Sequence, residues 1–142
     1  MNLNEIKGYW LFLDDERQPV QAYYYTHNTA YALNVWVVVR NYDDFVKMIE
    51  TRGLPSLVSF DHDLADVHYG YLHGEIPYDK FKEKTGWHCA KWLVDYCLDK
   101  NQPLPDFLVH SMNPTGGENI KGLLWNFKKF QDVQKESPSD QS

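Results

Sequence analysis

Four carboxylates stand where short apolar runs of this sequence stop, a position suited to metal or proton chemistry. Asp14 and Asp15 directly follow one run, and Asp61 and Asp63 follow another. Carboxylate oxygens at neighbouring strand ends bind a hard cation such as Mg²⁺; alternatively, they orient a histidine or share protons at raised pKa values. We take Asp14, Asp15 and Asp61 as candidate magnesium ligands. Asp15 and Asp63 could equally cap turns.

Two histidines, His62 and His110, stand at two of these run ends. Near neutral pH, a pair of histidines in one pocket can serve as general base and general acid. A neighbouring carboxylate would fix the tautomer of each ring and raise its pKa. We therefore predict that His62, His110 and Asp61 are catalytic, and the assignment of acid and base to the two rings stays open.

A third group of residues suits a phosphate. Ser111 and Asn113 precede two glycines, and the N-terminus of a helix predicted to follow Asn119 would offer a partial positive charge. Arg17 presents a planar fork of donors to a phosphate. We predict that Arg17, Ser111 and Asn113 bind phosphate. An ordinary turn with Asn119 as a helix cap is the alternative, and no Gly-Lys-Ser/Thr phosphate-loop motif follows.

The apolar runs that carry these residues are predicted as strands. They are continuous rather than alternating, which is typical of strands buried on both faces of a parallel sheet, and they cover residues 9–13, 35–39, 57–60 and 107–109. Helical patterns lie between them, one capped by Asn41, one opening at Thr85 and a last one after Asn119. Strands alternating with helices predict a three-layer α/β/α sandwich with a short parallel sheet.

This fold class predicts where the chemistry lies. In open parallel sheets, ligands bind beyond the carboxyl ends of the strands, where the candidate residues stand. A second arginine, Arg40, follows the strand at 35–39. The segment 19–31 is compatible with a short helix or an irregular loop, and the long segment 64–84 with a lid, a binding loop or an insertion.

Composition narrows the classes of protein. The 142 residues fit one domain, predicted at 1–133 with a flexible C-terminal tail at 134–142. A net charge of −6 argues against extended nucleic-acid binding, and no apolar run is long enough to predict a membrane span. Cys89 and Cys97 stand eight apart within one predicted helix, a spacing that suits neither a disulfide framework nor a zinc site and favours the cytoplasm.

Taken together, several motifs resemble the cyclic-phosphate processing receiver-like domains, which are related to response-regulator receivers. The motifs are Leu-Asp-Asp-Glu-Arg at 13–17, Phe-Asp-His-Asp-Leu at 60–64 and His-Ser-Met-Asn at 110–113, and the resemblance covers about residues 9–130. It implies a flavodoxin-like fold with strand order 2-1-3-4. By the same resemblance, Asp14 and Asp15 match the acidic pair that binds Mg²⁺ in receivers, Asp61 the phosphoryl acceptor and Ser111 the hydroxyl position.

The sequence departs from signalling receivers because it lacks a fifth strand with the family's lysine and carries histidines at 62 and 110. The leading hypothesis is therefore a phosphoesterase-type hydrolase that acts on cyclic phosphates of nucleotides, RNA ends or ADP-ribose derivatives. In this hypothesis Asp14 and Asp61 either bind Mg²⁺, the candidate cofactor, or orient the histidines. Its partner would be a small phosphorylated or cyclic-phosphate nucleotide. The alternatives are a non-catalytic module that binds such a nucleotide and a divergent receiver domain in signalling.

Overall fold

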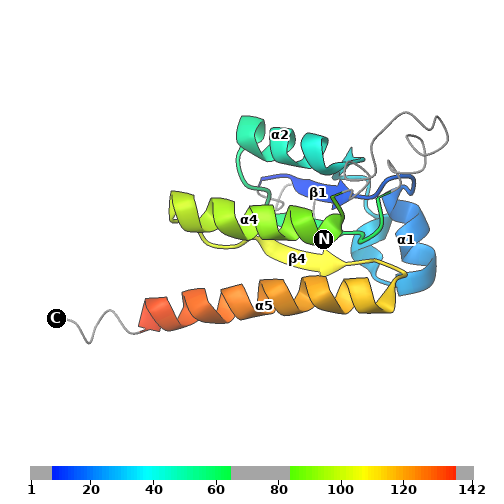
Figure 1. Cartoon of the computed structure of the whole chain (residues 1–142). Coiled ribbons are helices and arrows are strands. Elements are labelled where there is room, and N and C mark those ends of the chain that lie inside the picture. The colour runs from blue at the N-terminus through cyan, green and yellow to red at the C-terminus, as the bar shows by residue number, and fades with distance from the viewer. Residues whose placement is uncertain (1–7, 65–83, 137–142) are drawn as a thin grey trace, which may run out of the picture.

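Four short strands form one parallel sheet in the computed structural model, which describes residues 8–64 and 84–136. The strands are β1 (Trp10–Leu13), β2 (Trp36–Val39), β3 (Leu57–Phe60) and β4 (Asp106–Val109). Their order is β2-β1-β3-β4 and every pairing is parallel, which confirms the predicted receiver-like α/β fold. The carboxyl ends of the strands therefore meet at one edge of the sheet, at the right of Figure 1.

Two of the helices between the strands begin where the sequence pattern predicted. These are α2 (Tyr42–Arg52), where the Asn41 side chain accepts a hydrogen bond from a first-turn amide, and α4 (Gly86–Lys100), which Thr85 caps in the same way. The segment that the sequence left undecided forms the helix α1 (Pro19–Thr26) and a 3-10 turn, η2 (Thr29–Ala32).

The last helix, α5 (Pro114–Glu136), begins five residues before Asn119. The prediction that Asn119 caps this helix was therefore wrong. Asn113 is the cap, because its side-chain oxygen accepts the backbone N–H of Gly116 at 2.9 Å, and Pro114 supplies a φ suited to the first turn. The helix also continues through residues 134–136 of the expected tail. Residues 137–142, and 65–83 of the expected lid, lie outside the described residues.

Alternating side chains divide the sheet between two apolar layers. Leu11 and Leu13 of β1 belong to the large core under α2, α4 and α5, whereas Phe12 belongs to a smaller aromatic cluster with Ala22 and Tyr31 under α1 and η2. This arrangement is the predicted three-layer sandwich. Successive residues of a strand point to opposite faces, so the residue after Leu13 points toward the α1 layer.

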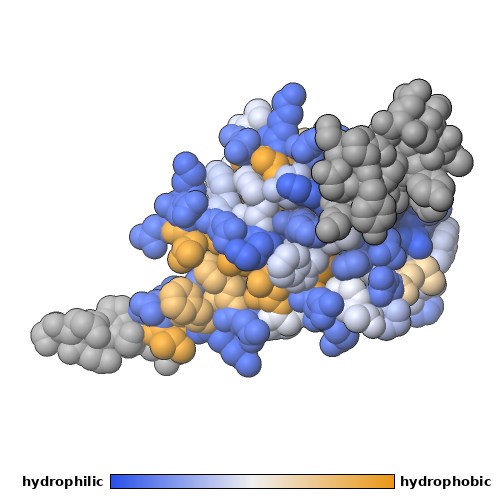
Figure 2. All heavy atoms as spheres, viewed as in Figure 1, coloured by the Kyte–Doolittle hydropathy of each residue, from blue (hydrophilic) through white to orange (hydrophobic). Residues whose placement is uncertain are grey.

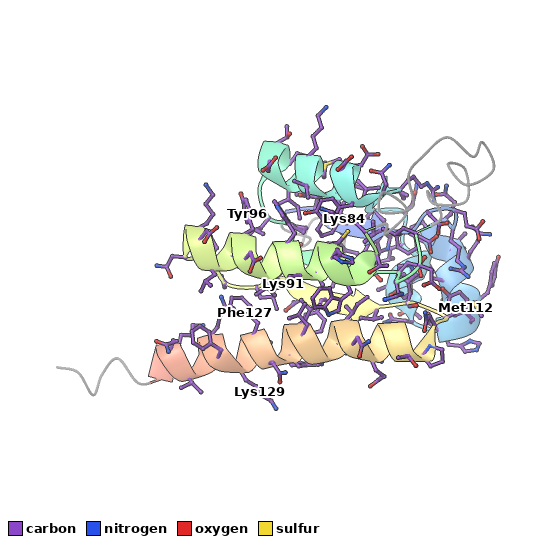
Figure 3. The ribbon with its side chains drawn as sticks, viewed as in Figure 1. Lys84, Lys91, Tyr96, Met112, Phe127 and Lys129 are labelled. Carbon is purple, nitrogen blue, oxygen red and sulfur yellow. The ribbon has the colours of Figure 1, made fainter. Side chains whose placement is uncertain are left out.

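The far end of the molecule is apolar and lies away from the strand carboxyl ends. A groove of about 550 Å³ lies between the C-terminal parts of α4 and α5, and the exposed residues Leu98 and Phe130 are among those that line it. Figure 2 shows orange, hydrophobic surface over this end of the molecule. Figure 3 shows Phe127 on the side of α5 that faces α4 and Lys129 on the opposite side. None of the described helices combines the length and apolar character needed to cross a membrane.

The two cysteines lie in α4, where both thiols are free and buried in the large core. Burial raises the pKa of Cys97 to about 11 and raises that of Cys89 further. Both thiols are therefore protonated at neutral pH and fill space in the core, as the sequence indicated.

Gly86 joins the first turn of α4 to the end of β3 and tolerates no side chain. Its N–H donates to the carbonyl of His62 at 2.7 Å, and a Cβ would lie only 1.7 Å from the carbonyl oxygen of Asp61. We expect Gly86→Ala to lower the free energy of unfolding by about 1–3 kcal/mol or more, because backbone must move. Urea unfolding followed by circular dichroism measures the change.

The control is Gly122→Ala in the middle of α5, where a Cβ would have no atom within 4 Å. Alanine is the better helix former there, and we expect this variant to gain about 0.5–1 kcal/mol. A Gly86→Ala protein as stable as the parent would contradict the close packing of α4 on the end of β3.

Candidate functional site

The sheet extends one residue beyond three of its strands and thereby aligns three candidate site residues. The backbone N–H groups of Asp14, Asp61 and His110 each donate to the carbonyl of the last residue in the neighbouring strand, at 3.0–3.1 Å. The apolar residue before each one belongs to or packs against the large core, so all three side chains point toward the α1 layer. The predicted convergence at the carboxyl edge is therefore present for these three.

Three carboxylates form a compact acidic cluster at this edge. One oxygen from each of Asp14, Asp15 and Asp61 lies within 4.8 Å of the other two. Asp14 and Asp61 are buried, and Asp15 is partly exposed. The oxygen donors and their spacing fit a hard divalent cation such as Mg²⁺, which commonly binds one or two carboxylates and completes its shell with water or phosphate.

Asp14 is the most constrained member of the acidic cluster. Its Oδ1 accepts the backbone N–H groups of Glu16 and Arg17 at 2.9 and 2.7 Å, and its Oδ2 accepts His110 Nε2 at 3.1 Å and Arg17 Nη1 at 3.3 Å. Burial alone would raise the pKa of Asp14, but the hydrogen bonds from His110 and the two amides lower it to about 2. Asp14 is therefore ionised at neutral pH.

Asp61 has the opposite electrostatic character. Burial, followed by repulsion from Asp14 and Asp15, raises its pKa to about 7, and this outweighs the attraction of Arg17 and the hydrogen bond from the backbone N–H of His62. Arg17 Nη1 approaches Asp61 Oδ2 only to 4.0 Å. The attraction of Arg17 therefore does not offset burial and the two neighbouring carboxylates at Asp61, a condition that a bound divalent cation would relieve.

His110 lies inside the protein rather than on its surface. The residue is 1% exposed, its Nε2 faces Asp14, and its Nδ1 lies 2.6 Å from Ser59 Oγ. The ring stacks on Phe12 with centroids 4.3 Å apart. Burial lowers the pKa of His110 despite the neighbouring Asp14, so the ring is neutral at pH 7. Both nitrogens have protein partners, which makes His110 a group that holds Asp14.

His62 has different surroundings. Its Nδ1 lies 2.8 Å from Asp63 Oδ1, and its side chain is 19% exposed. The ring packs against the first turn of α5, where a Cβ on Gly116 would come within 2.3–2.6 Å of ring atoms. The hydrogen bond from His62 also lowers the pKa of Asp63, and the Asn113 amide contributes to this from 3.2 Å. Asp63 is therefore an ionised partner that orients the imidazole.

The predicted phosphate ligands occupy the same edge of the sheet. Asn113 uses its side chain to cap α5 and to donate to Asp63. Ser111 Oγ accepts the backbone N–H of Asn113 at 3.0 Å, which leaves the hydroxyl proton to donate. Arg17 is held by Asp14 and by the sulfur of Met112, 3.3 Å from Nη2. Arg17 and Ser111 thus keep donors that a phosphate could accept.

Two residues brace the site in ways that the sequence did not reveal. Arg40 uses its guanidinium to bind the backbone carbonyls of Asp14 and Arg17 at 3.1 and 2.7 Å, so it supports the acidic loop. Tyr25 donates its hydroxyl to the carbonyl of His110 at 2.6 Å, and the Arg17 guanidinium lies 5.5 Å from its ring. Nothing in the spacing of segment 19–31 identified this tyrosine.

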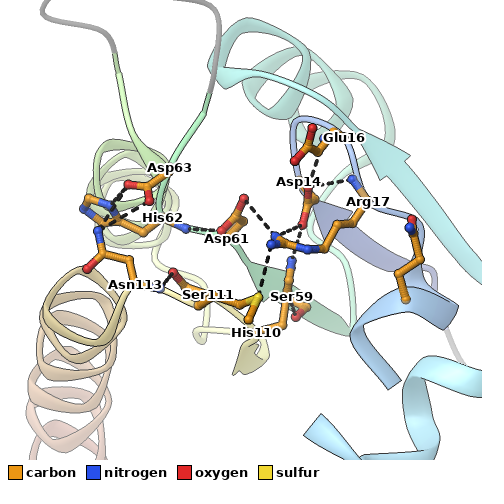
Figure 4. A network of polar contacts seen from close by, with 12 residues as sticks. Asp14, Glu16, Arg17, Ser59, Asp61, His62, Asp63, His110, Ser111 and Asn113 are labelled. Carbon is orange, nitrogen blue, oxygen red and sulfur yellow. Dashed lines mark hydrogen bonds and ion pairs between the residues drawn. The ribbon is translucent and has the colours of Figure 1, made fainter. Parts of the chain in front are cut away.

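The candidate residues therefore form two groups joined at Asp61 (Figure 4). One group holds the acidic cluster with Arg17 and His110, and the other holds His62, Asp63 and Asn113. Asp61 links them, because its Oδ1 accepts the N–H of His62 at 2.9 Å. No hydrogen bond among the described residues joins the rings of His62 and His110, which have separate partners.

A parallel sheet in the order β2-β1-β3-β4 with acidic strand ends defines a receiver-like α/β domain. Comparison with family models matches residues 9–126 to the cyclic-phosphate processing receiver domain, and the chain belongs to that family. A search of curated proteins and a search of solved structures returned no match. The family description connects the domain with the processing of cyclic phosphates.

The raised pKa of Asp61 predicts a contribution to stability that falls as pH rises. With a pKa of about 7 in the folded protein and an ordinary value of 3.8 in the unfolded chain, only the folded state holds this proton between about pH 4 and pH 7. In metal-free buffer the contribution of Asp61 to the free energy of unfolding should therefore fall across this window, by at most about 1.4 kcal/mol per pH unit. The lowered pKa of buried His110 contributes in the opposite sense below pH 6.5, so the contribution of Asp61 is read as the difference between the parent and an Asp61 variant. The contribution of Asp14 is lost only below pH 4, because its pKa is lowered.

Urea unfolding at several pH values, with EDTA present, measures this slope. Asp61→Asn should make the slope more positive than that of the parent and raise stability above pH 7, because the amide carries no charge at any pH in the window. Asp132→Asn, a change at an exposed position on α5, should keep the slope of the parent. An Asp61→Asn protein with an unchanged slope would show that another group is responsible.

Proposed function

We propose that this domain hydrolyses a cyclic phosphate on a nucleotide, an RNA end or an ADP-ribose derivative, in a reaction that requires Mg²⁺. The observation that supports this most strongly is the acidic cluster of Asp14, Asp15 and Asp61 beside Arg17, at the edge of the sheet where α5 begins. The family description points to the same class of substrate.

Charge explains why a cation belongs in the proposal. The three carboxylates of the acidic cluster would repel a phosphate, and repulsion at such distances is strong in a partly buried site. The acidic cluster would hold Mg²⁺ through carboxylate oxygens. When bound, the ion supplies positive charge that neutralises the phosphate and the charge that develops on it during attack.

His62 is suited to the role of general base. If its Nδ1–H donates to the Asp63 carboxylate, the lone pair lies on Nε2, which can accept a proton from water. The water oxygen would then attack phosphorus, and the P–O bond to one ring oxygen would break. The proton taken by His62 would pass to that leaving oxygen, so the products are an open phosphomonoester and a free hydroxyl.

Arg17 and Ser111 would bind the phosphoryl oxygens. Arg17 Nη2 faces Met112 sulfur, a weak acceptor that a phosphate oxygen would readily replace. The α5 N-terminus adds a partial positive charge at the same edge. In this assignment His110 stays neutral and holds Asp14, while Asn113 positions Asp63 and caps α5. His110 is then a positioning residue, unlike the acid or base role first considered for it.

Hydrolysis of a panel of substrates tests the role of His62. The panel is a cyclic mononucleotide, an RNA oligonucleotide with a cyclic phosphate end and a cyclic-phosphate derivative of ADP-ribose, each with Mg²⁺. We expect His62→Ala to lower kcat by about 10²–10⁴-fold on the accepted substrate with a smaller change in KM. His27→Asn should match the parent, because His27 is an exposed residue with φ of 57°, which asparagine adopts readily.

Two results would contradict the proposal. Equal kcat for His62→Ala and the parent would remove His62 from the reaction. Stoichiometric binding of a cyclic phosphate that is recovered intact after long incubation would instead show a binding module without turnover.

Magnesium binding provides a separate test of the acidic cluster. Isothermal titration with MgCl₂ should show one site in the parent, and Asp61→Asn should weaken it by at least about 10-fold because a charged ligand is lost. Asp132→Asn preserves the three carboxylates and should bind as the parent does. Equal affinity in the Asp61→Asn protein would place the metal elsewhere.

A further inference from the structure

A continuous row of polar side chains runs from the acidic cluster into the aromatic layer under η2. Tyr31 OH lies 2.6 Å from Ser59 Oγ, Ser59 Oγ lies 2.6 Å from His110 Nδ1, and His110 Nε2 lies 3.1 Å from Asp14 Oδ2. All four residues are at most 2% exposed. They come from η2, β3 and the residues that follow β4 and β1, so distant parts of the chain build the row.

The donors in this row can be assigned a direction. Asp14 acts as an acceptor, because backbone N–H groups and Arg17 donate to its two oxygens. His110 must then donate from Nε2, and as a neutral ring it accepts at Nδ1. The Ser59 hydroxyl fills that acceptor, and Tyr31 donates in turn to Ser59.

The reverse direction is disfavoured by the last residue of the row. If His110 donated to Ser59 and Ser59 donated to Tyr31, the Tyr31 proton would need an acceptor. Among the described residues the structure gives the Tyr31 hydroxyl no partner other than Ser59. A buried donor without an acceptor is costly, so the row runs from Tyr31 to Asp14.

We propose that Tyr31 and Ser59 are positioning residues that hold His110 as an Nε2–H donor to Asp14. Stacking on Phe12 and an edge contact with Tyr31, at centroid distances of 4.3 and 5.8 Å, fix the plane of the imidazole. The two hydrogen bonds fix its rotation in that plane, because a flipped ring would lose both. Asp14 is therefore aimed at the acidic cluster through residues of the aromatic layer under α1 and η2.

This inference rests on the proposed function for its consequence, which is a pre-organised magnesium ligand. Residues that orient a metal ligand through a hydrogen bond typically change metal affinity or activity by about 10–100-fold when removed. We expect Ser59→Ala to weaken Mg²⁺ binding by a factor in this range, and Tyr31→Phe to weaken it less because Ser59 can still donate.

Long-range ¹H–¹⁵N spectra of the metal-free protein decide the positioning claim without substrate or metal. In the parent, His110 should show a protonated Nε2 and an unprotonated, hydrogen-bonded Nδ1. In Ser59→Ala the Nδ1 signal should move toward that of a free acceptor, and the Nε2 proton should exchange with water at least about 10-fold faster. Tyr31→Phe should move both in the same direction by a smaller amount.

Two control variants separate this role from general loosening. Tyr25→Phe removes an equally short hydrogen bond to His110, but one made to its backbone carbonyl, and should leave both nitrogen signals unchanged. Val38→Ala removes apolar packing from the same aromatic layer and lowers stability without removing a polar group of the row. An Nε2 proton that exchanges equally fast in Val38→Ala and Ser59→Ala would overturn the proposal.

The proposal is also overturned if parent His110 carries its proton on Nδ1, or if Ser59→Ala leaves both nitrogen signals and the exchange rate unchanged. A parent protein that binds no Mg²⁺ would count against the proposed function. The nitrogen signals would still decide whether Ser59 and Tyr31 hold His110, so the two failures are distinguishable.

Discussion

Mutual repulsion among three carboxylates within 4.8 Å of one another is the constraint that organises this end of the domain. The surroundings of Asp14 and Asp61 offset this repulsion to different degrees. Asp14 accepts four hydrogen bonds and has a pKa lowered to about 2, whereas Asp61 accepts the backbone N–H of His62 and has a pKa raised to about 7. A hard cation is the natural remaining partner, because it would bring both carboxylates into their charged form together.

The same constraint separates the roles of the two histidines. The neutral ring of His110 donates to Asp14 from inside the protein, where a charged imidazolium would be costly. His62 lies against the start of α5 with an ionised Asp63 as its partner, which suits a group that gains and loses a proton. The difference between the two histidines follows from how deeply each ring is buried and from the residue that each ring hydrogen-bonds.

The sequence predicted the fold and the three members of the acidic cluster, because both depend on local pattern. Continuous apolar runs marked the strands, and strand order then placed the residues after them side by side. The start of α5 was missed because Gly116 and Gly117 suggested a turn, yet glycines after an Asn-Pro start are tolerated in a first helical turn. Ser59 was visible as a polar residue in a buried strand, which needs a partner, but its partner Tyr31 lay in a segment without periodicity.

Strand register shows what residue spacing alone omits. Phe60 pairs with Val109, so the next register position sets Asp61 beside His110, and His62 follows one residue further along the chain. Register is a tertiary property, and the sequence pattern specified only the strand ends.

The most direct test of the acidic site is a crystal structure of the full chain grown with Mn²⁺ and phosphate, using the anomalous signal of manganese. The account predicts one manganese peak among Asp14, Asp15 and Asp61, with phosphate between the ion and the start of α5, in contact with Arg17. A manganese peak away from these carboxylates, or phosphate bound elsewhere with Arg17 still held by Asp14, would contradict it.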